Sequence, residues 1–166
     1  RKQLVHGGTL RIFVSKKDNY PINDSVKIFV NEEHTLGLDN IEFYHKFSTN
    51  VKELKKNLIE LLTKLKKENK LLFGYGASAK GNVLLNYCNI DNHILEYVID
   101  TTPLKQGKYT PGTHIPVFSP EKIVHNTENI ALLLAWNYKS EILEKEKKFR
   151  EMGGKFLIPL PSPNLI

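Results

Sequence analysis

The chain has 166 residues, of which 40% are hydrophobic and 25% are charged, a composition typical of a globular protein. Lys and Arg outnumber Asp and Glu by 24 to 18, which gives a formal net charge of +6. The single Cys88 excludes an intramolecular disulfide and the common structural zinc sites, and no apolar run is long enough to span a membrane. We therefore expect a soluble chain in the reducing cytoplasm, with no membrane association.

The basic residues do not form a pattern typical of nucleic-acid binding. The lysines are concentrated in residues 52–70 and 139–148, where they alternate with Glu at helical spacing, as on a solvated helix face. Only three arginines occur, at positions 1, 11 and 150. We expect no nucleic-acid partner, although the basic excess favours phosphorylated ligands.

The first third of the chain predicts a strand and two helices. Residues 4–14 are typical of an apolar strand that lacks a partner nearby, and the polar residues 15–33 predict a domain boundary. Residues 37–48 predict a short helix with Asp39 as its N-cap. Residues 51–65 carry an apolar stripe at steps of three and four, which predicts a separate long helix.

From residue 70 onward, apolar strands alternate with helical segments. Strands buried on both faces and separated by helices predict a parallel sheet, so we expect an α/β, Rossmann-like, doubly wound fold with an N-terminal helical extension. Phe73, Ile99, Ala135 and Ile158 should lie on adjacent parallel strands. The predicted strands are residues 70–73, 94–99, 115–118, 130–135 and 155–160, and the predicted helices are residues 78–88, a segment from Ser119 with Pro120 at its first position, and residues 138–152.

Residues 74–79 match the pattern G-x-G-x-x-A between a strand and a helix, where dinucleotide-binding folds carry it. In this interpretation Gly74 allows the tight turn, Gly76 lets the backbone approach a ligand, and Ala79 keeps the helix close to the sheet. The helix start, with Lys80 beside it, could then bind a phosphate. The alternative is a glycine-rich turn that merely connects two elements.

Other polar residues should lie at the same carboxyl edge of the sheet. Asp100 ends the second strand, where dinucleotide folds place a ribose-binding carboxylate, so NAD is one possible ligand; a turn cap is an equally good interpretation. Asn137 follows the strand 130–135, and an irregular loop supplies Lys105, Lys108 and His114. Lysines in such a loop can instead be solvated and the His can simply bond the turn. No catalytic constellation and no metal site is indicated.

Several separated motifs occur in one order along the chain: GYGASAKGN at 74–82, LLNYC at 84–88, DTTPLKQGK at 100–108, PGTHIPV at 111–117 and AWN at 135–137. This series resembles the C-terminal domain of the deoxysugar C-methyltransferases, which are SAM-dependent enzymes. The segment HGGTLR at 6–11 is similar to the end of that family's middle domain. The resemblance covers nearly the whole chain.

The resemblance implies that residues 1–31 are the final strand of a preceding methyltransferase domain plus a linker. Residues 32–166 would be the Rossmann-like domain that holds an NDP-linked keto deoxysugar, which the whole enzyme methylates at a carbon next to the ketone. The family's zinc cysteines, its second glycine-rich turn for S-adenosylmethionine and its Glu-His-x-Tyr-Tyr-Phe-Ser motif are not found in this sequence. We therefore expect S-adenosylmethionine to bind to the parent enzyme, which would supply the zinc and SAM-binding domains, and this chain alone to hold no cofactor and to be inactive.

The resemblance also implies a set of substrate-binding residues and no catalytic or metal-binding residue. Two alternatives remain open: a free-standing NAD or nucleotide-sugar binding module of carbohydrate metabolism, and a helical interaction domain that uses residues 51–65. The implied substrate-binding residues are Gly74, Tyr75, Gly76, Ala77, Ser78, Lys80, Asn82, Asp100, Lys105, His114 and Asn137.

Overall fold

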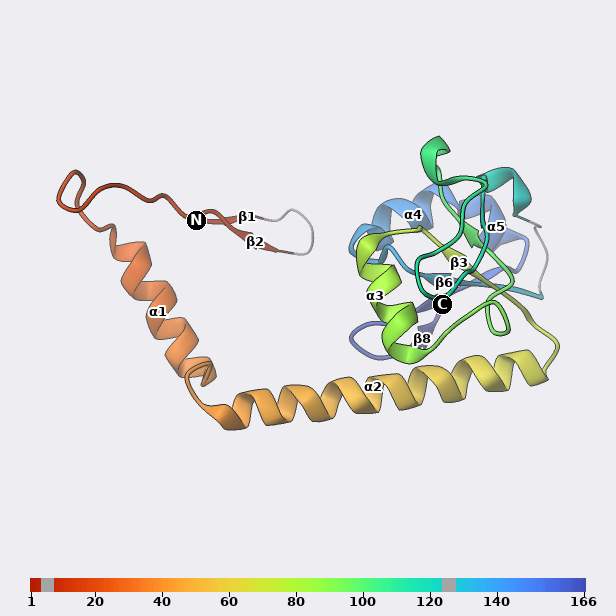
Figure 1. Ribbon diagram of the computed structural model, residues 1–166, viewed down its shortest axis with the longest axis horizontal. Helices are drawn as coiled ribbons and strands as arrows, with labels where there is room; N and C mark the ends of the chain where they lie inside the picture. Colours follow the sequence, from red (N-terminus) through yellow and green to blue (C-terminus); the bar gives the residue numbers. More distant parts are fainter. Residues whose placement is uncertain (4–7, 124–127) are drawn as a thin grey trace. The chain divides into compact units, whose positions relative to one another are not determined.

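The computed structural model describes residues 1–3, 8–123 and 128–166, which form two units, Arg1–Lys52 and Glu53–Ile166 (Figure 1). In the first unit, strands β1 (Lys2–Gln3) and β2 (Thr9–Leu10) pair antiparallel. The strand predicted over residues 4–14 is therefore wrong in part, because residues 11–14 are exposed and belong to no strand. Leu4 and His6 lie outside the described residues.

Two helices follow in place of the predicted linker and short helix. Helix α1 (Asp24–Leu36) begins at Asn23, whose side chain accepts a hydrogen bond from the Ser25 N–H, and ends at Gly37 in the left-handed conformation. The sequence predicted a polar domain boundary over residues 15–33 and no helix there. Helix α1 runs across the predicted boundary between residues 31 and 32. Helix α2 (Ile41–Lys67) is one uninterrupted helix of 27 residues, so the predicted break between residues 48 and 51 is wrong. No Gly or Pro interrupts this stretch.

The start of α2 also differs from the prediction. The side chain of Asn40, and not that of Asp39, accepts the hydrogen bond from a helical N–H group, the one of Glu42. Asp39 instead bonds the imidazole of His34 at 2.8 Å, a contact that bridges the turn between α1 and α2.

The second unit is built around a six-stranded sheet in the order β5-β4-β3-β6-β7-β8. The first five of these strands are parallel, and only β8 pairs antiparallel, with β7. Phe73, Ile99 and Ile158 lie on parallel strands as predicted, whereas Ala135 lies two residues beyond the end of β6. The strands are β3 (Leu71–Tyr75), β4 (Val98–Ile99), β5 (Val117–Phe118), β6 (Asn129–Leu133), β7 (Lys155–Ile158) and β8 (Asn164–Leu165).

Helices cover both faces of this sheet because successive strand residues point to opposite sides (Figure 1). On one face, Leu72 and Leu132 pack with the second half of α2 and with α3 (Ala79–Cys88), where Cys88 is buried as a core residue. On the other face, Phe73 and Leu133 pack with α4 (Lys139–Lys145) and α5 (Lys147–Glu151). Short 3-10 turns complete the unit: η2 (Pro103–Lys105), η3 (Pro120–Lys122) and η4 (Trp136–Tyr138).

The helix predicted over residues 138–152 is interrupted at Glu146, between α4 and α5. Glu146 is buried and accepts a hydrogen bond from the Tyr75 hydroxyl at 2.6 Å. Burial, followed by the neighbouring Glu146 carboxylate, raises the pKa of Tyr75 well above its usual value. Tyr75 therefore serves the packing of this face as a neutral hydrogen-bond donor.

Helix α3 lies very close to β6 because position 81 is a glycine. A Cβ atom on Gly81 would lie 2.5 Å from the Cβ of Leu134 and 3.0 Å from the Leu134 carbonyl oxygen. Ala79, which the sequence motif assigned to this close packing, is exposed. Gly81 is the residue that sets the distance between helix and sheet.

We expect Gly81→Ala to lower the free energy of unfolding by about 1 to 3 kcal/mol, because the added methyl group meets the Cβ and the carbonyl oxygen of Leu134. The same substitution at an open helical site would stabilise by about 0.5 to 1 kcal/mol. Urea unfolding measures the difference, with Val83→Ala on the exposed face of α3 as the control. A stabilising Gly81→Ala substitution would contradict the close contact.

Candidate functional site

The glycine-rich turn follows β3 and is shaped by contacts within the chain. A Cβ on Gly74 would lie 2.8 Å from a Leu134 methyl group and 2.9 Å from a Val98 methyl group. Gly76 has a φ angle of +90°, and a Cβ there would lie 2.7 Å from the Ala135 Cβ. Both glycines are therefore required by the packing of the sheet itself, whatever binds nearby.

The backbone N–H groups of this turn have acceptors inside the protein. Those of Gly76, Ala77 and Ser78 donate to the Ile99 carbonyl, the Asp100 carboxylate and the Gly76 carbonyl, respectively. Ser78 caps α3: its hydroxyl oxygen accepts from the Gly81 N–H and its hydroxyl donates to the Leu134 carbonyl. A phosphate could not bind to these three N–H groups without displacing internal bonds.

Asp100, directly after β4, joins three segments through its carboxylate. One oxygen accepts from the Ala77 N–H at 2.7 Å and from the Lys105 ammonium at 3.1 Å, and the other accepts from the Thr102 N–H at 2.8 Å. Lys105 also donates to the Ala77 carbonyl at 2.8 Å. The carboxylate thus takes, at the turn, the place that an anionic ligand would occupy.

The charge of Asp100 is stabilised by these partners. Burial raises the pKa of Asp100, but the hydrogen bonds from Thr102 and the Lys105 ammonium outweigh burial and hold the pKa below its usual value of 3.8. Asp100 is 8% exposed, so an unpaired charge here would be costly. Asp100 is therefore ionised at neutral pH and is held by bonds to Ala77, Thr102 and Lys105.

The loop after η2 is held on α3 and on β5. Asn86 of α3 donates to the Pro111 carbonyl at 3.0 Å, and the backbones of Gly107 and Lys108 bond that of Val117. The hydroxyls of Thr110 and Thr113 bond each other at 2.7 Å inside the loop. These bonds hold the predicted irregular loop as an ordered wall.

A cavity of about 440 Å³ opens between this wall and the start of α3. Two cations border it, Lys105 and Lys108, together with the ring of Tyr109. Asn82 lines it as well, and the buried Oδ1 of Asn82 accepts no hydrogen bond within the described part of the chain. The remaining lining residues are Ala77, Ser78, Ala79, Leu85, Leu104, Thr110, Pro111, Val117 and Leu134.

Four of the eleven predicted site residues line this cavity: Ala77, Ser78, Asn82 and Lys105. Asp100 lies beside it, bonded to two of them, while Gly74, Gly76 and Tyr75 belong to the packing of the sheet. The other three predicted residues, Lys80, His114 and Asn137, are not among its lining residues.

His114 is placed by its backbone. It is exposed, has a φ angle of +51°, and donates its N–H to the Thr110 carbonyl, which is the turn role that the sequence left as an alternative. Leu104 and Tyr109 were missed as lining residues; their position in the irregular loop beside Lys105 and Lys108 was the available signal.

Among the described residues, no cluster of three or more His, Cys, Asp or Glu side chains could hold a metal ion. None of the helices in this part of the chain is long and apolar enough to cross a membrane.

The second unit is thus an α/β domain with a nearly parallel sheet and a cavity lined by side chains at the carboxyl edge of that sheet. The profile of the C-methyltransferase C-terminal domain family matches residues 4–161, so the chain belongs to that family. It is 36% identical over 163 residues to the C-methyltransferase NovU of Streptomyces niveus. The alignment covers 98% of this chain and 39% of NovU, so the chain spans about two fifths of the length of this relative.

We expect Asp100→Asn to lower the free energy of unfolding by about 1 to 2 kcal/mol at pH 6.5, because the ion pair with the half-exposed Lys105 is lost. Since folding lowers the pKa of Asp100, the carboxylate stabilises the fold above pH 3.8 and this stabilisation disappears as the pH falls through the lowered pKa. The difference between wild type and variant should therefore shrink at about pH 2.5.

Urea unfolding at both pH values measures this difference, with the exposed Asp18→Asn as the control. An equal difference between wild type and Asp100→Asn at both pH values would show that the charge of Asp100 does not stabilise the fold.

Proposed function

We propose that this chain is the nucleotide-sugar-binding domain of a SAM-dependent sugar C-methyltransferase. The substrate would be an NDP-linked keto deoxysugar, methylated at a carbon adjacent to its ketone. Membership of the C-methyltransferase C-terminal domain family supports the reaction class. The observation that carries the ligand assignment is the cavity that combines two lysines with apolar and aromatic walls.

The chemistry of the lining suits the parts of a nucleotide sugar. Lys105 and Lys108 supply cations for a diphosphate, while Tyr109, Leu85 and Leu104 offer apolar surface to a base or a deoxysugar ring. A sugar hydroxyl is the kind of donor that would satisfy the buried Asn82 Oδ1.

The strand order supports a Rossmann-like interpretation. Numbered from β3, the sheet follows the order 3-2-1-4-5, with the antiparallel β8 at its edge. In such sheets a ligand binds at the carboxyl edge where the order reverses, here between β3 and β6. Two residues that line the cavity come soon after those strands: Leu134 directly follows β6, and Ala77 is the second residue after β3.

We infer that the groups that perform the chemistry lie elsewhere in a longer polypeptide. Methyl transfer to a carbon beside a ketone requires a base for the α proton and stabilisation of the enolate. No carboxylate or imidazole is among the residues that line the cavity. This domain would hold and orient the substrate, and the base would approach from another domain.

The residues of this chain do not fit S-adenosylmethionine or NAD at the glycine-rich turn. Both cofactors need a carboxylate for their ribose hydroxyls, and Asp100, the residue at that position, already accepts hydrogen bonds from Ala77, Thr102 and Lys105. The methyl donor is therefore assigned to the remainder of the parent enzyme, and the NAD-binding alternative is the weaker of the two.

We expect Lys108→Ala to weaken the binding of nucleotide sugars by about 10- to 100-fold, which corresponds to one charge-assisted hydrogen bond of about 1.5 to 3 kcal/mol. Titration calorimetry with a panel of nucleotide sugars measures the change. Lys80→Ala is the matched control, since it removes an exposed lysine at the start of α3 that does not line the cavity.

A larger loss with Lys80→Ala than with Lys108→Ala would place the diphosphate at the helix start and contradict the cavity assignment. Tight NAD binding that Asp100→Ala abolishes, with no affinity for any nucleotide sugar, would favour the NAD-binding alternative.

We expect the purified 166-residue chain to transfer no methyl group from S-adenosylmethionine to any keto sugar nucleotide, because no carboxylate or imidazole lines its cavity to act as the base. Mass spectrometry of the sugar nucleotide after long incubation tests this, with the full-length enzyme as the positive control. A methylated product from the 166-residue chain alone would refute the division of roles.

A further inference from the structure

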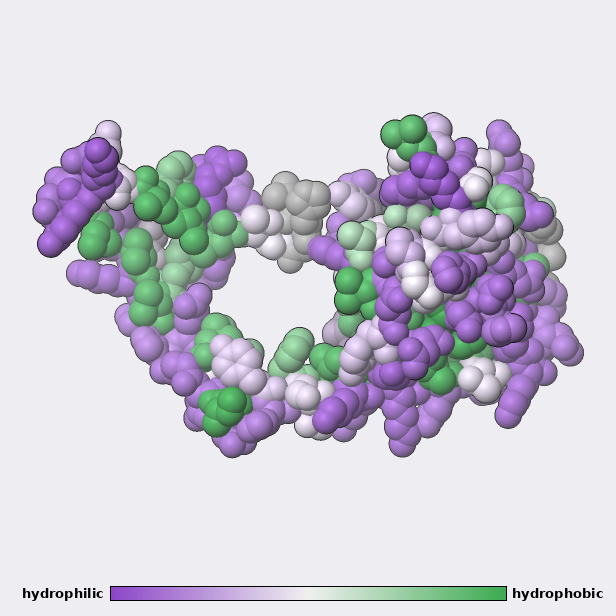
Figure 2. Space-filling view, viewed as in Figure 1, coloured by the Kyte–Doolittle hydropathy of each residue, from purple (hydrophilic) through white to green (hydrophobic). Residues whose placement is uncertain are grey.

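Residues 1–52 expose an unusually apolar surface. Helix α1 contains no buried residue, and Leu36 at its end is 63% exposed. On the first turns of α2, Phe43 and Phe47 are 37% and 62% exposed. Figure 2 shows hydrophobic residues gathered along α1 and the beginning of α2. Exposed apolar surface of this kind marks an interaction site.

The exposed rings belong to a stripe that is buried further along the same helix. Phe43, Phe47, Val51, Leu54 and Leu58 follow one another at steps of four, four, three and four, so they share one face of α2. Leu58 is fully buried on the sheet of the second unit, and Leu54 is packed against the same cluster. The sheet covers this stripe from Leu54 onward, and nothing in the described residues buries Phe47.

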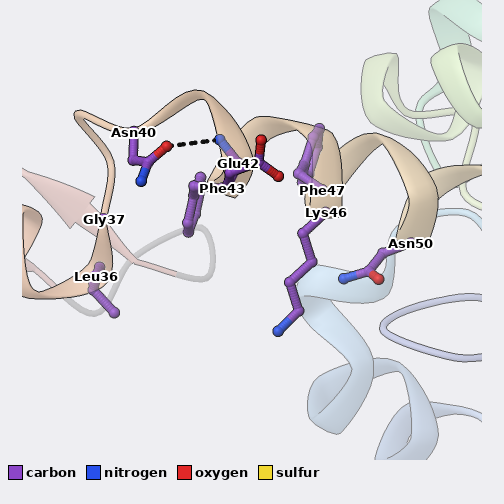
Figure 3. A pocket seen from close by; sticks show the side chains of 8 residues that line it. All are labelled: Leu36, Gly37, Asn40, Glu42, Phe43, Lys46, Phe47 and Asn50. Carbon is purple, nitrogen blue, oxygen red and sulfur yellow. Dashed lines mark hydrogen bonds between the residues drawn. The ribbon is translucent and has the colours of Figure 1, made fainter.

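A hollow marks the exposed end of the stripe. Leu36, Phe43 and Phe47 line a cavity of about 460 Å³ where α1 meets α2, and Figure 3 shows their side chains around it. Charged residues of both signs, Glu42 and Lys46, stand at its border. An apolar centre with a charged rim is typical of a docking surface.

We propose that the cluster of Leu36, Phe43 and Phe47 docks onto the part of the same polypeptide that precedes residue 1, the methyl-donor portion of the enzyme. The family is a C-terminal domain family, and the aligned segment is 39% of NovU, so most of that relative lies outside the segment. The cluster lies in the first unit, Arg1–Lys52, which would directly follow the preceding part of the polypeptide. In the second unit, by contrast, the apolar residues of the sheet are already buried in its own two core clusters.

This inference rests on the proposed function for the existence of a methyl-donor portion, yet it is tested separately. Hydrogen exchange of the amides of residues 41–50 is compared between the 166-residue chain and the natural polypeptide isolated from its source. We expect exchange to be at least tenfold slower in the natural polypeptide, because docking suppresses opening of the helix. Nucleotide-sugar binding at Lys108 is a different readout and can fail without affecting this result.

Two variants test which face of α2 is the docking face. Phe47→Lys places a charge in the cluster, whereas Thr49→Lys places the same charge on the opposite side of the same helical turn. In the 166-residue chain both residues are exposed, so neither variant should change the unfolding midpoint. In the natural polypeptide only Phe47→Lys should restore fast exchange over residues 41–50.

Three results would overturn the proposal. Equal exchange in the short and natural chains would show that no preceding segment covers the helix, as would a natural polypeptide that begins near residue 1. Sedimentation of the 166-residue chain as a dimer that Phe47→Lys dissociates would identify a second copy as the occupant.

Discussion

The candidate site depends on the hydrogen bonds that the buried carboxylate of Asp100 accepts. This carboxylate ties the turn after β3, through the Ala77 N–H, to Thr102 and Lys105 in the segment that leads into the cavity wall. A buried carboxylate is stable only when its charge is matched, and Lys105 together with two N–H groups provides that match. The position of Lys105 at the cavity follows from this pairing, so the same bonds that stabilise the fold also hold one cation at the cavity.

This constraint gives a familiar glycine pattern a different role. Gly74, Gly76 and Gly81 allow strands β3, β4 and β6 and helix α3 to pack closely, and Asp100 already binds the turn that a dinucleotide phosphate would approach. In the proposed function, recognition of the ligand therefore falls to side chains of the loop from Leu104 to Pro111. A domain that binds a substrate in this way, without a base of its own, fits the proposed division of one reaction between parts of a longer enzyme.

The parallel sheet was predictable because each strand is a short apolar run between helical segments. Local patterns could not show that Glu146 interrupts a helix, because its partner, Tyr75, lies 71 positions away. Helix α1 was missed because its apolar residues face outward in a segment rich in polar residues. The family resemblance pointed to Ala77, Ser78, Asn82 and Lys105, which line the cavity, but the internal role of Asp100 depends on distances that spacing along the chain does not encode.

In the proposed function, a nucleoside diphosphate binds to the loop side of the cavity while the Asp100 network stays intact. Titration of the isotope-labelled chain with nucleoside diphosphates, followed by amide NMR shifts, tests this most directly. We expect large shifts for Lys105, Lys108 and Tyr109, and an Ala77 amide whose shift still reports its hydrogen bond to Asp100. Release of the Ala77 amide from Asp100, with the largest shifts at residues 76–80 and none in the loop, would contradict it.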